Sequence, residues 1–329
     1  MKNVFKALGI IALVVVIGFS MAACGGGDDG GGGSGGGGSG GGGTGGTGGG
    51  GGGSGGGGEG GGSSSMIEMV SIHAGTFMMG SPTTEPGRRG DETQHSVTLS
   101  SFKMSKYQVT QEQYQAVMGT NPSYFSSNPQ AGETQGKRPV EGVSWYDAIV
   151  FCNKLSIKEG LSPAYSISGR TDPAVWGSVP TDYNTTWDAV KIVTGSTGYR
   201  LPTEAQWEYA CRAGTTTAYN TGATISDNTG WYKSNSGDKT HQVGLKPANA
   251  WGLYDMHGNV EEWCWDWIGS YPSEAQTNPM GASSGFFRVL RGGYWSLSAE
   301  DLRSATRVSY QAYRRDYGHI SLGFRLVRP

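Results

Sequence analysis

Three stretches of this chain place apolar residues at helical spacing behind a polar capping residue. Thr110 with Gln113 forms the pattern of a capping box, and the helix that it opens should stop at Gly119. Ser144 opens a second stretch, whose apolar residues recur at helical spacing as far as Gly160. These capped ends predict two helices that serve as scaffold.

The third helix and two strands are predicted from shorter patterns. Thr203 with Gln206 caps a stretch with an apolar face that ends at Gly214. Residues 97–102 alternate as a half-buried strand does, and residues 323–327 have the apolar pattern of a closing strand. Elsewhere, short apolar pieces are broken by Gly, Asn, Ser and Pro. We therefore expect an irregular α+β fold with few helices and short strands.

The N-terminus has the pattern of an export signal. Two lysines precede an apolar stretch over residues 7–19, which is too short for a stable membrane span. Cys24 follows Met21 and two alanines and resembles a bacterial lipobox, although Met21 departs from the usual leucine. We expect residues 1–23 to be a lipoprotein signal peptide and Cys24 to carry the acyl chains that anchor the protein. An ordinary signal peptide with an incidental cysteine is the alternative.

Residues 24–65 consist almost entirely of glycine after the cysteine. No apolar side chain offsets the entropy of ordering this segment, so it should be disordered. Its typical reach is about 35 Å. We interpret it as a tether that lifts a folded head off the membrane, and a repeat tract without a role is the alternative.

The remaining residues, 66–329, are long enough for one large domain with its own core. The formal net charge of −2 gives no basic field and argues against a nucleic-acid partner. Cys152, Cys211 and Cys264 are an odd set, so at least one thiol is unpaired, and their apolar surroundings predict buried, unreactive thiols. The histidines are scattered singly, without the spacing of a metal motif.

Four longer motifs follow one another in this head. They are Gly142 to Ala148 (GVSWYDA), Tyr199 to Tyr209 (YRLPTEAQWEY), Trp251 to Trp263 (WGLYDMHGNVEEW), and the C-terminal pair Arg288 to Trp295 (RVLRGGYW) with Gly323 to Arg328 (GFRLVR). In this order they resemble the formylglycine-generating enzyme (sulfatase-modifying factor) domain over residues 66–329. The resemblance implies a C-type-lectin-like fold, but function depends on the site and not on the fold.

The same resemblance argues against the chemistry of that family. Its enzymes carry two catalytic cysteines, five residues apart, shortly after a Gly-Gly pair. Counted from Gly292 and Gly293, those places hold Leu297 and Leu302, which cannot form a thiolate, bind copper or form a disulfide. We therefore expect no formylglycine formation, no catalytic residues and no catalytic cofactor. The alternative is an exported enzyme of the same superfamily with different chemistry.

A loop within the third motif resembles a calcium site of the family. Carried over by position, its ligands are Asp255, the main-chain carbonyls of Gly258 and Val260, and Glu262. Oxygen ligands of this kind are those that Ca²⁺ prefers. The resemblance thus implies a structural calcium ion, and the alternative is that these groups cap the turn among themselves.

Four arginines, Arg291, Arg303, Arg307 and Arg325, recur through the C-terminal region. Planar guanidinium groups suit buried carboxylates and carbonyls, so we expect a framework rather than a site for an anionic ligand. The residues between the arginines should then form an exposed patch. Its members are Tyr294, Ser296, Leu297, Ser298, Glu300, Asp301, Thr306, Val308, Ser309, Tyr310, Tyr313, Asp316, Tyr317 and His319. Tyrosine among small polar residues is a composition typical of binding surfaces.

A frame that holds such a patch resembles the variable proteins of diversity-generating retroelements, and the lipobox and tether are most similar to the variable lipoproteins of treponemes. In those proteins, error-prone reverse transcription at adenines rewrites asparagine-rich codons. Most of the patch is reachable from an asparagine codon in this way, and Trp295, which is not, lies in the frame. Glu300 is not reachable either, which departs from the pattern. An undiversified member of the family is the alternative.

Together these patterns predict an exported, lipid-anchored protein at the outer membrane and cell surface. Its C-terminal region, about residues 288–329, should bind a protein or other cell-surface ligand without catalysis. The expected partners are that ligand and, through the lipid anchor, a membrane, with no nucleic acid. A structural envelope protein without a specific ligand is a further alternative.

Overall fold

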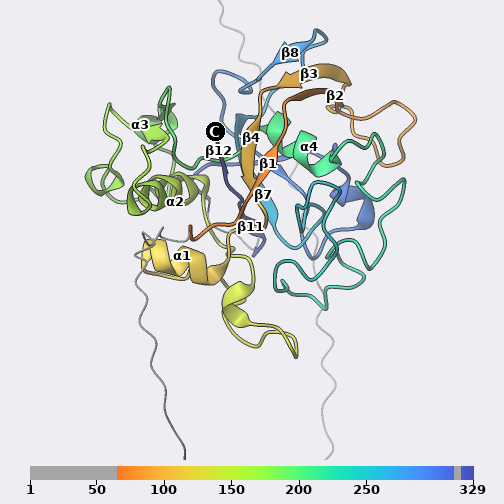
Figure 1. Ribbon diagram of the computed structural model, residues 1–329, viewed down its shortest axis with the longest axis horizontal. Coiled ribbons are helices and arrows are strands. Elements are labelled where there is room, and N and C mark those ends of the chain that lie inside the picture. The colour runs from red at the N-terminus through yellow and green to blue at the C-terminus, as the bar shows by residue number, and fades with distance from the viewer. Residues whose placement is uncertain (1–64, 315–319) are drawn as a thin grey trace, which may run out of the picture. The chain divides into compact units, whose positions relative to one another are not determined.

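The computed structural model describes residues 65–314 and 320–329 (Figure 1). The predicted signal peptide, Cys24 and the glycine-rich tether lie outside these residues. No helix in the described part is long and apolar enough to span a bilayer.

Two helices form where their capping residues predict them. Helix α1 (Gln111–Met118) begins after Thr110 in a capping box and ends at Gly119, which has a left-handed φ of 83°. Helix α2 (Trp145–Lys158) begins after Ser144 in a second capping box, and its apolar side chains are buried. Both predictions are confirmed because the signals that set these ends are local.

Helix α4 (Glu204–Arg212) also begins after its predicted cap, Thr203, but ends one residue early. Ala213 takes the left-handed conformation in place of Gly214, with a φ of 47°, and donates its N–H to the carbonyl of Tyr209. The other helical pieces are single turns. They are α3 (Thr185–Asp188), η1 (Gln135–Lys137), η2 (Pro173–Val175) and η3 (Ala299–Leu302).

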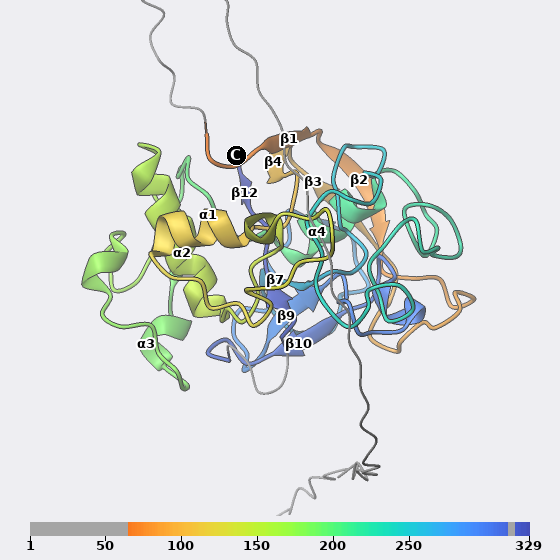
Figure 2. The ribbon, with the colours of Figure 1, turned by 90° about the horizontal axis from the view of Figure 1, so that it is seen from below.

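The strands form four small sheets in the described residues. The first has the order β1 (Met69–Ile72), β4 (Phe102–Ser105), β12 (Val327–Arg328), and the second the order β10 (Val308–Tyr310), β9 (Arg288–Arg291), β7 (Glu261–Trp267), β11 (Leu322–Gly323). The third has the order β2 (Gly75–Met79), β3 (His95–Leu99), β8 (Gln276–Thr277), and the fourth pairs β5 (Tyr165–Ser166) with β6 (Lys191–Ile192). Figure 2 shows β7, β9 and β10 side by side.

Both predicted strands are divided between sheets. Residues 97–102 end one strand at Leu99 and begin another at Phe102, and Asn278 accepts the N–H of Ser100 at the break, at 2.8 Å. Residues 323–327 likewise pass from β11, which pairs with β7, to β12, which pairs with β4. The apolar pattern marks burial correctly but does not show where the chain changes sheets.

Helices α2 and α4 pack against opposite faces of the four-stranded sheet. Trp263 and Leu290, which are register partners, belong to the same buried cluster as α2. Their neighbours Cys264 and Val289 belong to the cluster that contains α4. Side chains alternate between the two faces of a strand, so successive residues of β7 and β9 face opposite sides of the sheet. The irregular α+β domain that the sequence predicts is thus confirmed, with this sheet between its two main helices.

Candidate functional site

A cavity of about 300 Å³ opens beside the four-stranded sheet, on the face that carries Trp263 and Leu290. All four strands of the sheet contribute to its lining. The lining residues are Arg89, Glu261, Leu290, Tyr294, Leu297, Asp301, Val308, Tyr310 and Leu322. Five of them, Tyr294, Leu297, Asp301, Val308 and Tyr310, were predicted from the sequence as patch residues.

The register of the sheet explains why these residues meet. Val308 pairs with Leu290, and Glu261 pairs with Leu322, so the four side chains lie on one face. Val308 and Tyr310 are two positions apart on β10 and therefore face the same side. The floor of the cavity is consequently built on strands and not on loops.

A turn at Gly292 and Gly293 brings Tyr294 over this floor. Both glycines have positive φ values, 94° and 68°. A Cβ at Gly293 would lie 2.9 Å from the side chain of Leu302, so the turn has room for glycine only. The next residue, Trp295, is buried and donates its indole N–H to the carbonyl of Ile320 at 3.2 Å. Trp295 is therefore part of the frame, as predicted.

Glu261 is the charged group of the floor, and sequence analysis missed it. Its side chain lines the cavity while the residue is only 7% exposed. No described residue donates a hydrogen bond to its carboxylate, and burial raises its pKa to about 7. The alternation of β7 could have separated it from its neighbour Glu262, since adjacent acids on a strand point to opposite faces.

Arg89 and Asp301 form an ion pair at the rim of the cavity, with 2.6 Å between Nη2 and Oδ1. Arg89 also donates from Nη1 to the carbonyl of Arg307 at 3.3 Å. Ser298 donates its hydroxyl to the other carboxylate oxygen of Asp301 at 2.7 Å. Arg89 lies between β2 and β3, far from Asp301 in the chain, so no local pattern could have indicated it.

The rest of the predicted patch does not line this cavity. Thr306 is buried, and its hydroxyl donates to the carbonyl of Glu300 at 3.4 Å, so its prediction as an exposed residue is wrong. Ser298 and Glu300 are exposed and border a separate hollow beside Tyr219. Three members are half-buried outside the cavity, namely Ser296, Ser309 and Tyr313. Three more fall outside the described residues, namely Asp316, Tyr317 and His319.

The four predicted framework arginines are all buried and paired. Their partners are Glu204 and Glu208 for Arg291, Glu85 and Glu92 for Arg303, Glu204 for Arg307, and Glu262 for Arg325. The framework interpretation is confirmed, and it fixes the chain on both sides of the cavity lining.

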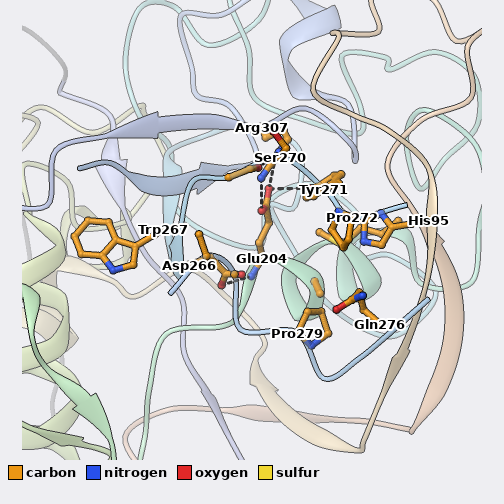
Figure 3. Close-up of a pocket in the computed structure, with 15 residues that line it drawn as sticks. His95, Glu204, Asp266, Trp267, Ser270, Tyr271, Pro272, Gln276, Pro279 and Arg307 are labelled. Atoms are coloured by element: carbon orange, nitrogen blue, oxygen red, sulfur yellow. Dashed lines mark hydrogen bonds and ion pairs between the residues drawn. The ribbon is translucent and has the colours of Figure 1, made fainter. Parts of the chain in front are cut away.

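A second cavity, of about 180 Å³, surrounds one of these pairs (Figure 3). Glu204 accepts from Arg307 at 2.8 Å and from the hydroxyl of Tyr271 at 2.9 Å. Burial opposes ionisation of Glu204, but Arg307 and Arg291 hold its pKa below the ordinary value. Burial also raises the pKa of neighbouring Asp266 to about 7. The hydrogen bonds of Glu204 thus fix the position of the Arg307 guanidinium.

The second cavity does not have the arrangement of a hydrolytic site. Ser270 and His95 both line it, but no hydrogen bond joins them among the described residues, and activation of a serine requires one. His95 instead faces the carbonyl of Thr93 at 3.2 Å. We therefore assign this cavity to the framework.

The described cysteines are buried, as predicted, and burial disfavours their thiolate forms. Cys152, Cys211 and Cys264 are all free and buried. Burial raises the pKa of Cys211 to about 12 and lowers that of His257, 3.8 Å away, to about 4. Such a pair stays neutral and supplies no thiolate. Of the two leucines that the family resemblance places at the catalytic positions, Leu302 is fully buried and Leu297 lines the first cavity.

The predicted calcium loop forms a ring of oxygen atoms around the side-chain nitrogen of Gln108. Nε2 of Gln108 lies 2.9 Å from Oε1 of Glu262, 3.1 Å from the carbonyl of Val260, and 3.2 Å from the carbonyls of Gly258 and Asp255. Asp255 thus offers its main chain to the ring, while its carboxylate accepts the N–H of Gly244 at 2.8 Å. Sequence analysis placed the carboxylate in the ring and did not include Gln108.

The ring residues fit a cation. An amide nitrogen has two protons, too few for four acceptors. The buried Oε1 of Gln108 and Oδ1 of Asp255 have no hydrogen-bond partner in the described part of the chain. A half-turn of the Gln108 amide would present Oε1 as a fifth oxygen, and hard oxygen ligands suit Ca²⁺. We therefore propose that a calcium ion would bind at this ring.

Comparisons with known proteins agree with this architecture. The solved structure of Treponema denticola variable protein 1 is 42% identical, with a TM-score of 0.73 over 79% of this chain and 95% of that chain. Chaperone protein LppX of Paenibacillus barcinonensis is 40% identical over 235 residues, which cover 65% of this chain and 75% of LppX. The formylglycine-generating enzyme of Mus musculus is 28% identical over 290 residues, covering 79% of this chain and 75% of the enzyme.

The treponemal structure confirms the predicted resemblance to variable proteins and the C-type-lectin-like form of the mixed α+β fold. The family model described as "Sulfatase-modifying factor enzyme 1-like domain" matches residues 61–329. This chain therefore belongs to the sulfatase-modifying factor enzyme 1-like domain family.

Proposed function

We propose that this protein is a non-catalytic ligand-binding lipoprotein, anchored through Cys24 and displayed at the cell surface. Its ligand is a protein that contacts the cavity beside the four-stranded sheet. One observation carries the proposal: five residues of the predicted patch meet in that cavity on a floor of paired strands. Rigid strands below and substitutable side chains above are the requirements of a diversified binding site.

The composition of the cavity supports a protein ligand. Tyr294 and Tyr310 provide large aromatic surfaces with a hydroxyl group, and Leu290, Val308 and Leu322 provide apolar contact. Aromatic side chains in such pockets dominate the free energy of protein association. The similarity to Treponema denticola variable protein 1 supports a region that diversifies while its frame stays constant.

An enzyme of the same family is the alternative function, and the described residues do not favour it. The buried thiols are protonated, and neither cavity pairs a nucleophile with a base. We therefore propose that the chemistry of the family has been lost and its frame kept for binding.

Replacing Tyr294 and Leu297 together by alanine should abolish ligand capture and leave the fold intact. Both side chains are half-buried at the cavity wall, and aromatic anchors often contribute about 2 kcal/mol or more, which is about 30-fold in affinity. The measurement is a pull-down from surface proteins of host or neighbouring cells, paired with a thermal melt of each variant.

Tyr183→Ala is the matched control, because this tyrosine is 54% exposed and does not line the cavity. It should capture the same proteins as the wild type. If the double variant at Tyr294 and Leu297 keeps every partner while remaining folded, the cavity is not the binding site and the proposal fails.

The protein should also form no formylglycine. Leucines stand at both catalytic places, and leucine has no group that can bind copper or abstract a hydrogen. A sulfatase peptide containing Cys-x-Pro-x-Arg, incubated with the protein, oxygen and copper, should keep its cysteine by mass spectrometry. An active formylglycine-generating enzyme serves as the positive control, and aldehyde that forms in proportion to this protein would disprove the expectation.

A further inference from the structure

Glu261 is a buried acid whose side chain lines the cavity beside the four-stranded sheet. It lies at the start of β7, where its main-chain N–H donates to the carbonyl of Ser321 at 2.8 Å. Its carboxylate accepts no hydrogen bond from any residue that the structure describes, although the residue is only 7% exposed. Burial of a carboxylate without a donor is unfavourable for folding. The side chain lines a cavity, so a ligand can supply what the protein does not.

The other two charged groups described in the cavity, Arg89 and Asp301, already pair with each other. Arg89 donates to Asp301 at 2.6 Å and to the carbonyl of Arg307 at 3.3 Å. Its charge acts on Glu261 through space, and the charge of Asp301 opposes that effect. Among the described residues, two carboxylates and one guanidinium therefore face the cavity, so an ionised Glu261 leaves one negative charge there without a described counter-charge.

The walls around Glu261 are apolar and aromatic. Leu322 is its register partner, and Leu290 and Val308 lie beside it on the same face. Tyr294, which follows the turn at Gly292 and Gly293, adds an aromatic ring to the lining. An acidic end and an apolar wall together fit an alkyl chain that ends in a cation.

We propose that the cavity takes a lysine or arginine side chain of the protein ligand, with its cationic group on Glu261 and its alkyl stem against Leu290, Val308 and Leu322. This inference rests on the function proposed above and names the part of the ligand that enters the cavity. Glu261 lies outside the predicted variable region, so it provides a constant contact while Tyr294, Leu297 and Tyr310 vary around it.

Peptides selected from a random phage-displayed library on the full-length protein test the proposal. Peptides whose binding requires Tyr294 should share one lysine or arginine. Changing that residue to norleucine, which keeps the stem and removes the charge, should weaken binding at least about tenfold. Glu261→Gln should produce the same loss, whereas Glu274→Gln, at an exposed acid outside both the cavity and the predicted patch, should leave binding unchanged.

A thermal melt checks that Glu261→Gln is folded. The glutamine keeps the shape of the side chain and removes a buried charge to which no described residue donates, so the variant should melt at or above the temperature of the wild type.

The outcomes separate the two proposals. If the selected peptides require Tyr294 but share no basic residue, or if Glu261→Gln does not weaken their binding, the proposal of a basic side chain is wrong. The proposed binding function is unaffected by that result. A selection that yields no peptide dependent on Tyr294 overturns both.

Discussion

Alanine at Arg303 is expected to lower the free energy of unfolding by about 3–5 kcal/mol. The guanidinium is buried and donates to Glu92 at 2.7 Å, to Glu85 at 2.6 Å and to the carbonyl of Gly87 at 2.7 Å. Although burial opposes ionisation, Arg303 and Ser81 hold the pKa of Glu92 below its ordinary value. Without the arginine, a buried negative charge loses its partner, which is more costly than losing an exposed ion pair.

Urea unfolding followed by tryptophan fluorescence measures this loss. Its pH dependence has a definite sign: because Arg303 depresses the pKa of Glu92, the stabilisation is present at neutral pH and is lost as the pH falls through the lowered pKa. The difference between wild type and variant should therefore shrink in acid.

Glu68→Ala is the matched control. It breaks the ion pair with Lys106, also a 2.7 Å contact, but the Glu68 side chain is 60% exposed. This change should lower stability by no more than about 1 kcal/mol. An Arg303→Ala effect as small as that of the control would show that the buried network is not what holds the C-terminal region.

The Arg303 network also connects stability to binding. It joins η3 to the connection between β2 and β3. The first of these segments contributes Asp301 to the cavity rim, and the second contributes Arg89. We therefore expect Arg303→Ala to weaken ligand capture as well, through displacement of the rim and not through a lost contact with the ligand.

Calcium is expected to raise the melting temperature of the wild-type protein, and a chelator to lower it. An ion that binds only the native state stabilises it by about 2.7 kcal/mol at 100 times its dissociation constant. The oxygen ring of Asp255, Gly258, Val260 and Glu262, with the unpartnered Oε1 of Gln108, is the place where it would bind. Thermal melts in calcium and in chelator measure the effect.

The choice of variant decides whether this experiment is informative. Glu262 also pairs with Arg325 at 2.6 Å and accepts the indole N–H of Trp207 at 2.6 Å, so its removal destabilises the fold with or without an ion. Gln108→Ala leaves that pair in place and should remove most of the calcium response. A wild-type melting temperature that ignores the chelator would mean that the amide of Gln108 closes the ring by itself.

The elements that sequence analysis placed correctly depend on contacts within a few residues. The capping boxes at Thr110, Ser144 and Thr203 join residues three apart, so their signals are visible in the chain. The framework role of the arginines was also predictable, because a guanidinium among apolar residues requires a buried acceptor. Which carboxylate each arginine meets was not predictable.

The residues that sequence analysis missed act through long-range contacts. Arg89 meets Asp301 across 212 positions of the chain, and Gln108 meets Glu262 across 154. No period or motif joins such positions. Thr306 was misplaced for a related reason: the segment around it is irregular, and neither alternation nor helical spacing shows which of its side chains turn inward.

By itself, the sequence determined the family, the main helices and the framework role of the C-terminal arginines. These are properties of residue identity and of local spacing. Only the tertiary structure decided that five members of the predicted patch share a cavity with Glu261 and Arg89, and that others are buried or lie elsewhere. The physical reason is that strand register and buried ion pairs select which distant side chains meet, and both are set by packing of the whole domain.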